Sequence, residues 1–178
     1  MNIFAMYEST ILNAQSLDDR RLNKLMIEMS QMISTAFDRH QLWNPTMCAP
    51  AFANHPCTRW VGDSICNLAW AISSYESMHY EWTKIRGFNR HINFFTYIAS
   101  FDKNYSSLPL SMSVKPTPFA NCASNLELGI SFKHIEDVNL AYRMYYSARI
   151  KKDEADGKIL RWTNRSRPEF INYLGKEL

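Results

Sequence analysis

SLDDRRLNKLMIEMSQMISTAF, residues 16–37, carries the clearest helical pattern in the chain. Its apolar residues recur at the three- and four-residue spacing that lines one face of a helix. They are Leu22, Leu25, Met26, Met29, Met32, Ile33 and Ala36. Ser16 and Asp19 fit a capping box, which places an acidic residue in the first turn, where the helix dipole favours it. The stretch therefore predicts one long amphipathic helix that packs in a core.

A polar stripe runs beside this apolar face, and Glu28 is its central residue. The stripe consists of Arg21, Lys24, Glu28, Gln31 and Thr35. In one interpretation Glu28 is an exposed helix residue that pairs with Lys24 at i, i+4, a weak contribution to stability. In the other, the stripe is the floor of a pocket, and Glu28 is a general acid/base or binds a ligand. Helical periodicity by itself leaves both interpretations open.

The overall composition limits the class of protein. The chain has 178 residues, of which 46% are hydrophobic and 21% are charged, which is typical of one globular domain. No apolar run approaches the roughly 20 residues needed to span a bilayer, so we expect no membrane association. The net charge is +3, and residues 143–178 hold nine Lys or Arg against five Asp or Glu. A basic C-terminal third is compatible with phosphate contacts.

Further helices follow from spacing and from the positions of proline and glycine. We expect helices at residues 9–15, 57–84, 90–100, 135–152 and 158–164, with Gly87 ending the second of these. Prolines punctuate the regions 38–57 and 105–129, which we expect to be irregular. No series of strands is evident. The predicted fold is mainly α, a single compact helical domain over residues 1–178, with about five helices and long Pro-containing loops.

Two groups of residues could hold a phosphate or a base. Asn54 and His55 precede Pro56 at the start of a predicted helix, with Arg59 one turn on, so they either cap that helix or surround an anion. Arg143 and Tyr146 lie together on the predicted helix 135–152. There a tyrosine could stack on a base and an arginine could contact a phosphate, or the tyrosines could simply be core residues.

The four cysteines form no C-x-x-C pair, and we expect reduced thiols rather than a disulfide framework. A zinc site from Cys48, His55, Cys57 and Cys122 is the less favoured alternative, because these spacings match no common zinc pattern. We therefore expect no metal and no other cofactor.

Several short motifs, in this order, resemble the pyrimidine-dimer DNA glycosylase family known from bacteriophages. The pattern L-x-D-x-x-L-x-x-x-x-x-E, with Leu17, Asp19, Leu22 and Glu28, is similar to the family's first helix. The long helix that ends in Arg86-Gly87-Phe88 is similar to its second helix. The opening residues 1–4, the Asn-His-Pro-Cys sequence at 54–57, residues 141–146 and the C-terminal residues 167–176 also resemble the family, in particular its mostly uncharacterised branch.

This resemblance implies a compact helical fold and a DNA glycosylase/AP-lyase activity on damaged or modified pyrimidine bases. Family enzymes attack the sugar C1′ with an N-terminal amine, form an imine and use a helix glutamate. By resemblance the amine is that of Met1 and the glutamate is Glu28. Arg21, Lys24, His55, Arg59 and Arg143 would then hold phosphates, with Asn54 and Tyr146 beside them in the nucleotide site.

A second hypothesis comes from the positions where the chain departs from the family pattern. Residue 2 is Asn where the family exposes a Thr, and Ile27 and Gln31 stand where the family's catalytic helix carries arginines. The fold would then keep its pocket without the nucleophile and bind a free nucleotide, for example as a phage anti-defence protein that sequesters a nucleotide signal. Either way we expect a nucleic acid or nucleotide partner and a location in the cytoplasm of an infected or bacterial cell. The sequence leaves the oligomeric state open, a homo-oligomer included.

Overall fold

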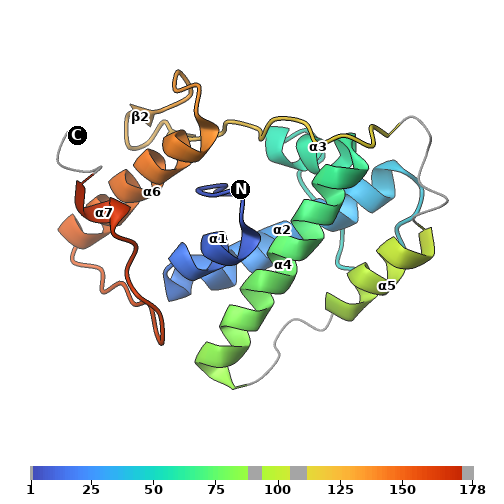
Figure 1. The fold of residues 1–178 in the computed structure, drawn as a ribbon, viewed down its shortest axis with the longest axis horizontal. Coiled ribbons are helices and arrows are strands. Elements are labelled where there is room, and N and C mark those ends of the chain that lie inside the picture. The colour runs from blue at the N-terminus through green and yellow to red at the C-terminus, as the bar shows by residue number, and fades with distance from the viewer. Residues whose placement is uncertain (1, 88–93, 105–111, 174–178) are drawn as a thin grey trace.

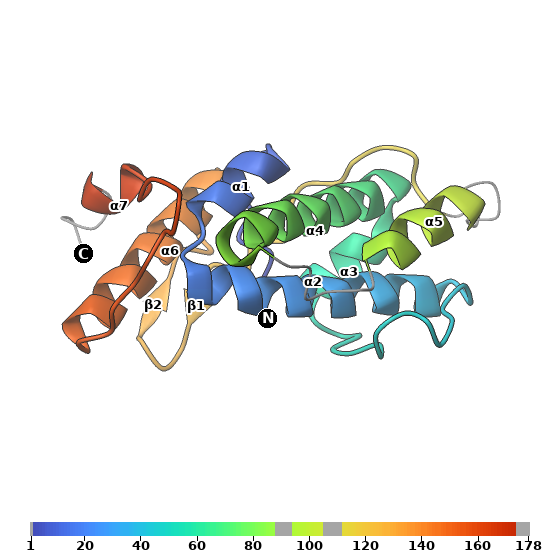
Figure 2. The same cartoon turned by 90° about the horizontal axis from the view of Figure 1, so that it is seen from below.

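The computed structural model describes residues 2–87, 94–104 and 112–173, and these residues form a mainly helical fold. Helices α2 (Asp19–Arg39) and α4 (Ile65–Arg86) pack against each other and run side by side through the centre (Figure 2). Helix α3 (Pro56–Asp63) packs on both of them, while α1 (Thr10–Ser16) and α5 (Phe94–Asn104) pack on α4. Helices α6 (Val138–Ala155) and α7 (Phe170–Tyr173) form the opposite side of the molecule (Figure 1). The predicted fold class is thus confirmed.

Helix α2 has the predicted apolar face, since all seven residues of that face are buried. Its start differs from the prediction. Asp18 is the N-cap and accepts from the backbone N–H groups of Arg20 and Arg21, whereas Ser16 ends the separate helix α1. Leu17 and Asp18 are both extended, which leaves no continuous helix through residue 16. The predicted Ser16–Asp19 capping box is therefore wrong.

The single helix predicted for residues 57–84 is two helices, α3 and α4. Ser64 between them is extended and caps α4 by accepting from the Asn67 N–H. The break is fixed by tertiary contacts, because the Ile65 N–H donates to the carbonyl of Ser113 at 2.9 Å. Gly87 ends α4 in the left-handed conformation, with φ of 71°, as predicted.

Residues 2–6 form a segment without helix or strand that packs against α6 and turns at Phe4, which has φ of 42°. Asn2, Ile3, Ala5 and Met6 are buried with Phe4, whose ring stacks on Tyr145 with centroids 5.6 Å apart. The Phe4 ring also meets Tyr146 edge-on. The start of the chain is therefore packed in the core, and it joins α6 to the rest of that core.

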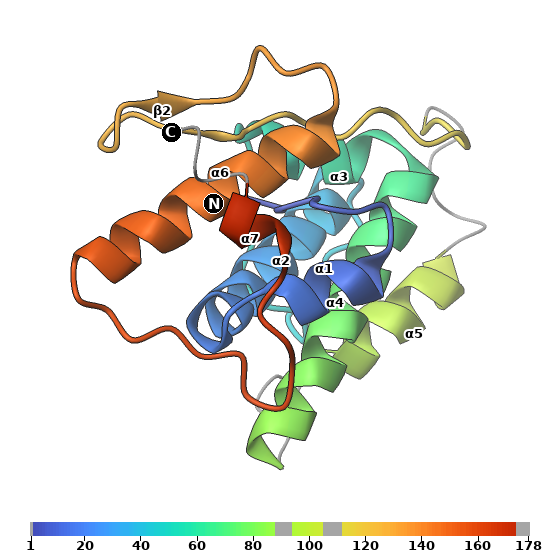
Figure 3. The same cartoon turned by 60° about the vertical axis from the view of Figure 1, so that its left-hand side comes forward.

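The remaining predicted elements are placed as follows. The helix expected at 158–164 is absent, and this segment has no regular structure before a turn at 163–164. Gly157, with φ of 76°, ends the preceding helix, and Trp162 Nε1 donates to the carbonyl of Ser16. The helix expected at 90–100 is α5, and residues 88–93 lie outside the described residues. Residues 112–129 are irregular up to a hairpin of β1 (Ser124–Asn125) and β2 (Ile130–Ser131), which lies beside α6 (Figure 3).

Within the described ranges, no helix is both long and apolar enough to cross a lipid bilayer.

Candidate nucleotide site

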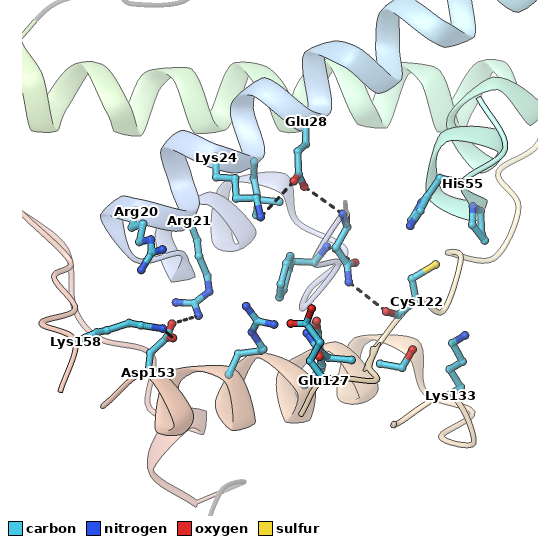
Figure 4. Close-up of a pocket in the computed structure, with 18 residues that line it drawn as sticks. Arg20, Arg21, Lys24, Glu28, His55, Cys122, Glu127, Lys133, Asp153 and Lys158 are labelled. Carbon is cyan, nitrogen blue, oxygen red and sulfur yellow. Dashed lines mark hydrogen bonds and ion pairs between the residues drawn. The ribbon is translucent and has the colours of Figure 1, made fainter. Parts of the chain in front are cut away.

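A cavity of about 550 Å³ lies between α2, the start of α3, the β hairpin and α6. Its walls are mainly polar, and Figure 4 shows the side chains that surround it. Six are basic (Arg20, Arg21, Lys24, Lys133, Arg149 and Lys158) and three are acidic (Glu28, Glu127 and Asp153). The cavity volume is within the range of small-molecule sites, and the surplus of cations suits an anionic ligand.

Glu28 extends from α2 toward this cavity (Figure 4). Its Oε1 lies 3.6 Å from Nζ of Lys24, so the i, i+4 ion pair is present. The side chain of Glu28 is nevertheless only 14% exposed, whereas that of Lys24 is 71% exposed. Oε2 of Glu28 accepts from the backbone N–H of Asn2 at 3.3 Å. The carboxylate thus joins α2 to the N-terminal segment at the cavity wall.

Arg21 also lines the cavity, and two buried carboxylates hold its guanidinium. Nη1 donates to Asp18 at 2.7 Å, and Nη2 donates to Asp153 of α6 at 2.5 Å. Burial by itself would lower the pKa of Arg21, but these two carboxylates outweigh it and raise the pKa. Asp153 is also bound by Nζ of Lys158 at 2.5 Å. Arg21 therefore links α2 to α6, and both of its terminal nitrogens already donate to carboxylates.

His55 and Cys122 form the other end of the cavity. His55 is the N-cap of α3, and its Nδ1 accepts from the Cys57 N–H at 3.2 Å, so the capping interpretation of His55 is confirmed. Burial lowers the pKa of His55, which favours the neutral imidazole at neutral pH. The thiol of the buried Cys57 donates to the sulfur of Cys122 and lowers the pKa of Cys122 to about 7. The same contact, together with burial, raises the pKa of Cys57.

Four of the predicted site residues lie away from this cavity. Asn54 and Arg59 are exposed and do not line it. Arg143 lies over the ring of Tyr7 and donates to the carbonyl of Met6. Tyr146 is fully buried and donates to Asp18 at 3.0 Å, which makes it a core residue. Met1 lies outside the described residues.

Several residues of the cavity wall have no distinct functional signal in the sequence. They are Asn2, Arg20, Cys122, Glu127, Lys133, Arg149 and Lys158. The basic excess after residue 143 is the one signal that includes Arg149 and Lys158. The sequence indicates Cys122 only as a possible metal ligand, together with Cys48, His55 and Cys57. Of those four, Cys48 is elsewhere, where its sulfur accepts from Ser30 and Tyr97.

The first half of the chain matches a known protein family. A family model described as "Pyrimidine dimer DNA glycosylase" matches residues 1–96, more than half of the chain. The chain belongs to the pyrimidine dimer DNA glycosylase family. No curated protein sequence and no solved structure gives a significant match. In this member of the pyrimidine dimer DNA glycosylase family, Glu28 and His55 lie in the matched region, whereas the wall from Cys122 to Lys158 lies beyond it.

Proposed function

We propose that this protein is a DNA glycosylase/AP lyase that acts on damaged or modified pyrimidine bases, with the cavity beside Glu28 as its active site. Family membership suggests the class of reaction. The observation that supports the site is the hydrogen bond from the Asn2 N–H to Oε2 of Glu28. It brings the start of the chain to the one carboxylate that α2 presents to the cavity.

The amine of Met1 is the proposed nucleophile, and covalent geometry limits its distance from Glu28. Three bonds separate this amine from the backbone nitrogen of Asn2, so the two nitrogens can be no more than about 4 Å apart. An α-amine has an ordinary pKa near 8, so a useful fraction is neutral and nucleophilic at neutral pH. The amine would attack C1′ of the target nucleotide, displace the base and form an imine, and strand cleavage would follow by elimination.

Glu28 would act as the general acid/base in this reaction. Its carboxylate can stabilise the cationic imine and can move the protons that the attack and the elimination release. Chemistry at C1′ of a duplex requires the target nucleotide to leave the stack, and the cavity volume of about 550 Å³ is sufficient for one nucleotide. Lys24, Arg20 and Lys133 at the cavity wall would contact the flanking phosphates.

The test is borohydride trapping on an abasic-site duplex and on a duplex with a pyrimidine dimer. We expect a covalent protein–DNA adduct with the unmodified chain, at least 100-fold slower trapping with Glu28→Gln, and none after the N-terminal amine is blocked. Glu76→Gln, which changes an exposed glutamate on α4 outside the cavity, is the matched control and should trap normally. Equal trapping by Glu28→Gln and the unmodified chain would refute the assignment of Glu28.

The geometry of Arg21 favours a second candidate function, the binding of a free nucleotide. Both of its terminal nitrogens are bound to carboxylates, which reduces the number of cations available to a long DNA backbone. A cavity of this size and charge could instead sequester one small nucleotide. Calorimetry with free nucleotides, run beside the trapping assay, distinguishes the two: tight nucleotide binding without any adduct would replace the first proposal with the second.

A further inference from the structure

Three side chains of types that ligate metals meet at one end of the cavity. The ligand atoms of His55, Cys57 and Cys122 all lie within 4.8 Å of one another. His55 and Cys57 come from the start of α3, and Cys122 comes from the loop before β1. One imidazole and two thiols form a donor set that zinc prefers, and all three atoms are near enough to bind a single ion after small adjustments.

A hydroxyl group from the core holds these two segments in place. Tyr142 of α6 is fully buried, and its hydroxyl donates to the carbonyl of Ala120 at 2.6 Å and accepts from the Cys122 N–H at 3.2 Å. The same hydroxyl lies 3.9 Å from Sγ of Cys57. The side chain of Asn2 adds a hydrogen bond to the Cys122 carbonyl. The ligands are therefore positioned by fixed neighbours, as a preformed metal site requires.

The burial of the three ligands indicates how an ion would face the cavity. Cys57 is buried, whereas His55 and Cys122 are half-buried and line the cavity. An ion held by all three would keep a coordination position for a water molecule or a ligand oxygen on the cavity side. Three protein ligands with one open position is the arrangement of catalytic rather than structural zinc sites.

We propose that His55, Cys57 and Cys122 bind one thiophilic divalent metal ion of the zinc type. Binding replaces the two thiol protons and releases them to solvent. It also replaces the hydrogen bond from the Cys57 N–H to Nδ1 of His55, because Nδ1 would then carry either the metal or the ring proton. Metal binding is favourable despite the loss of this hydrogen bond, because a neutral hydrogen bond contributes much less free energy than a metal–ligand bond.

The test uses the full chain, stripped by a chelator and kept reduced with a phosphine. Cobalt(II) is titrated in, and thiolate-to-cobalt charge-transfer absorption is recorded, followed by displacement with zinc and elemental analysis. We expect one ion per chain and a stable charge-transfer band. Cys122→Ser and Cys57→Ser should each weaken binding at least 10-fold, while Cys48→Ser and Cys66→Ser, which remove thiols outside the cluster, should bind as the unmodified chain does.

Each remaining outcome decides the proposal. Absence of the band, much less than one ion per chain, or unchanged binding by Cys122→Ser would overturn it. Equal loss on Cys48→Ser or Cys66→Ser would do the same, because it would indicate nonspecific thiol binding. If the variant at the buried Cys57 does not fold, Cys122→Ser and His55→Ala decide, with folding checked by the melting curve of each metal-free variant. Glu28→Gln should keep the metal, which separates this result from the trapping assay.

Discussion

Arg21 shows how a residue chosen for phosphate binding can also have a structural role. The sequence places it on the polar stripe of α2, but it cannot reveal that Asp153, 132 positions away, reaches the same guanidinium. The result is a buried ion pair between Arg21 of α2 and Asp153 of α6. Arg21 forms a second ion pair with Asp18, and its guanidinium carbon lies 5.5 Å from the centre of the Tyr146 ring. A phosphate bound near Arg21 would have to compete with these carboxylates or bind beside them.

This network predicts a pH-dependent stability change in Asp153→Asn. Burial would raise the pKa of Asp153, but hydrogen bonds from Lys158 and Arg21 outweigh it and lower the pKa in the folded state. The stabilisation is therefore complete above the unfolded pKa of about 3.9 and is lost as the pH falls through the lower folded value. We expect Asp153→Asn to lose about 2 kcal/mol near neutral pH, with a smaller difference in strong acid.

Urea denaturation of both proteins over a pH series measures this effect. The exposed Asp102→Asn on α5 is the control and should change the free energy of unfolding little at any pH. A constant difference between Asp153→Asn and the unmodified chain down to strong acid would contradict the role given to the carboxylate.

At the scale of elements, local periodicity identified the helices that carry the core, but not where they are interrupted. The three- and four-residue spacing in α2 is a property of neighbouring residues, so the sequence alone suffices for it. The break at Ser64 depends on a backbone partner at Ser113, which no local pattern contains. The same distinction holds at the site: Lys24 and Glu28 share one turn of one helix and were predicted, whereas Cys122 and Lys133 reach the cavity only through tertiary packing.

Gly62 lies where α3 packs closely against α2, so the size of the side chain at this position should affect stability. A Cβ at Gly62 would lie 3.3 Å from Nη1 of Arg39 and 3.6 Å from Cα of Ala36. The first neighbour is the end of a flexible side chain, and Ala is the better helix former by about 1 kcal/mol. Gly62→Ala should therefore be neutral or slightly stabilising.

Gly62→Val should instead destabilise the protein by about 1–3 kcal/mol, because its additional methyl groups press on the backbone of α2. Thermal melts of both variants measure the difference. Equal melting temperatures for the alanine and valine variants would mean that the two helices are not in close contact at this point.

At the scale of the whole molecule, the cavity is formed by two parts of the chain. The matched family region contributes α2 and the start of α3, while the β hairpin and α6 complete the opposite wall. Residues 2–6 lie between these parts and pack on α6 through Phe4. The C-terminal half is thus needed for the electrostatics of the site as well as for its shape, since three of the six cavity cations follow residue 96.

Arg149 of α6 tests this contribution through the salt dependence of DNA binding. Each phosphate that a protein neutralises releases condensed counterions, so the logarithm of affinity falls with the logarithm of salt concentration. If duplex DNA lies across the cavity, Arg149→Gln should weaken binding at low salt and reduce that slope by about 1. Lys103→Gln, an exposed cation on α5, should leave the slope unchanged. Fluorescence anisotropy of a labelled duplex over a salt series gives both numbers, and an unchanged slope for Arg149→Gln would place the DNA backbone elsewhere on the protein.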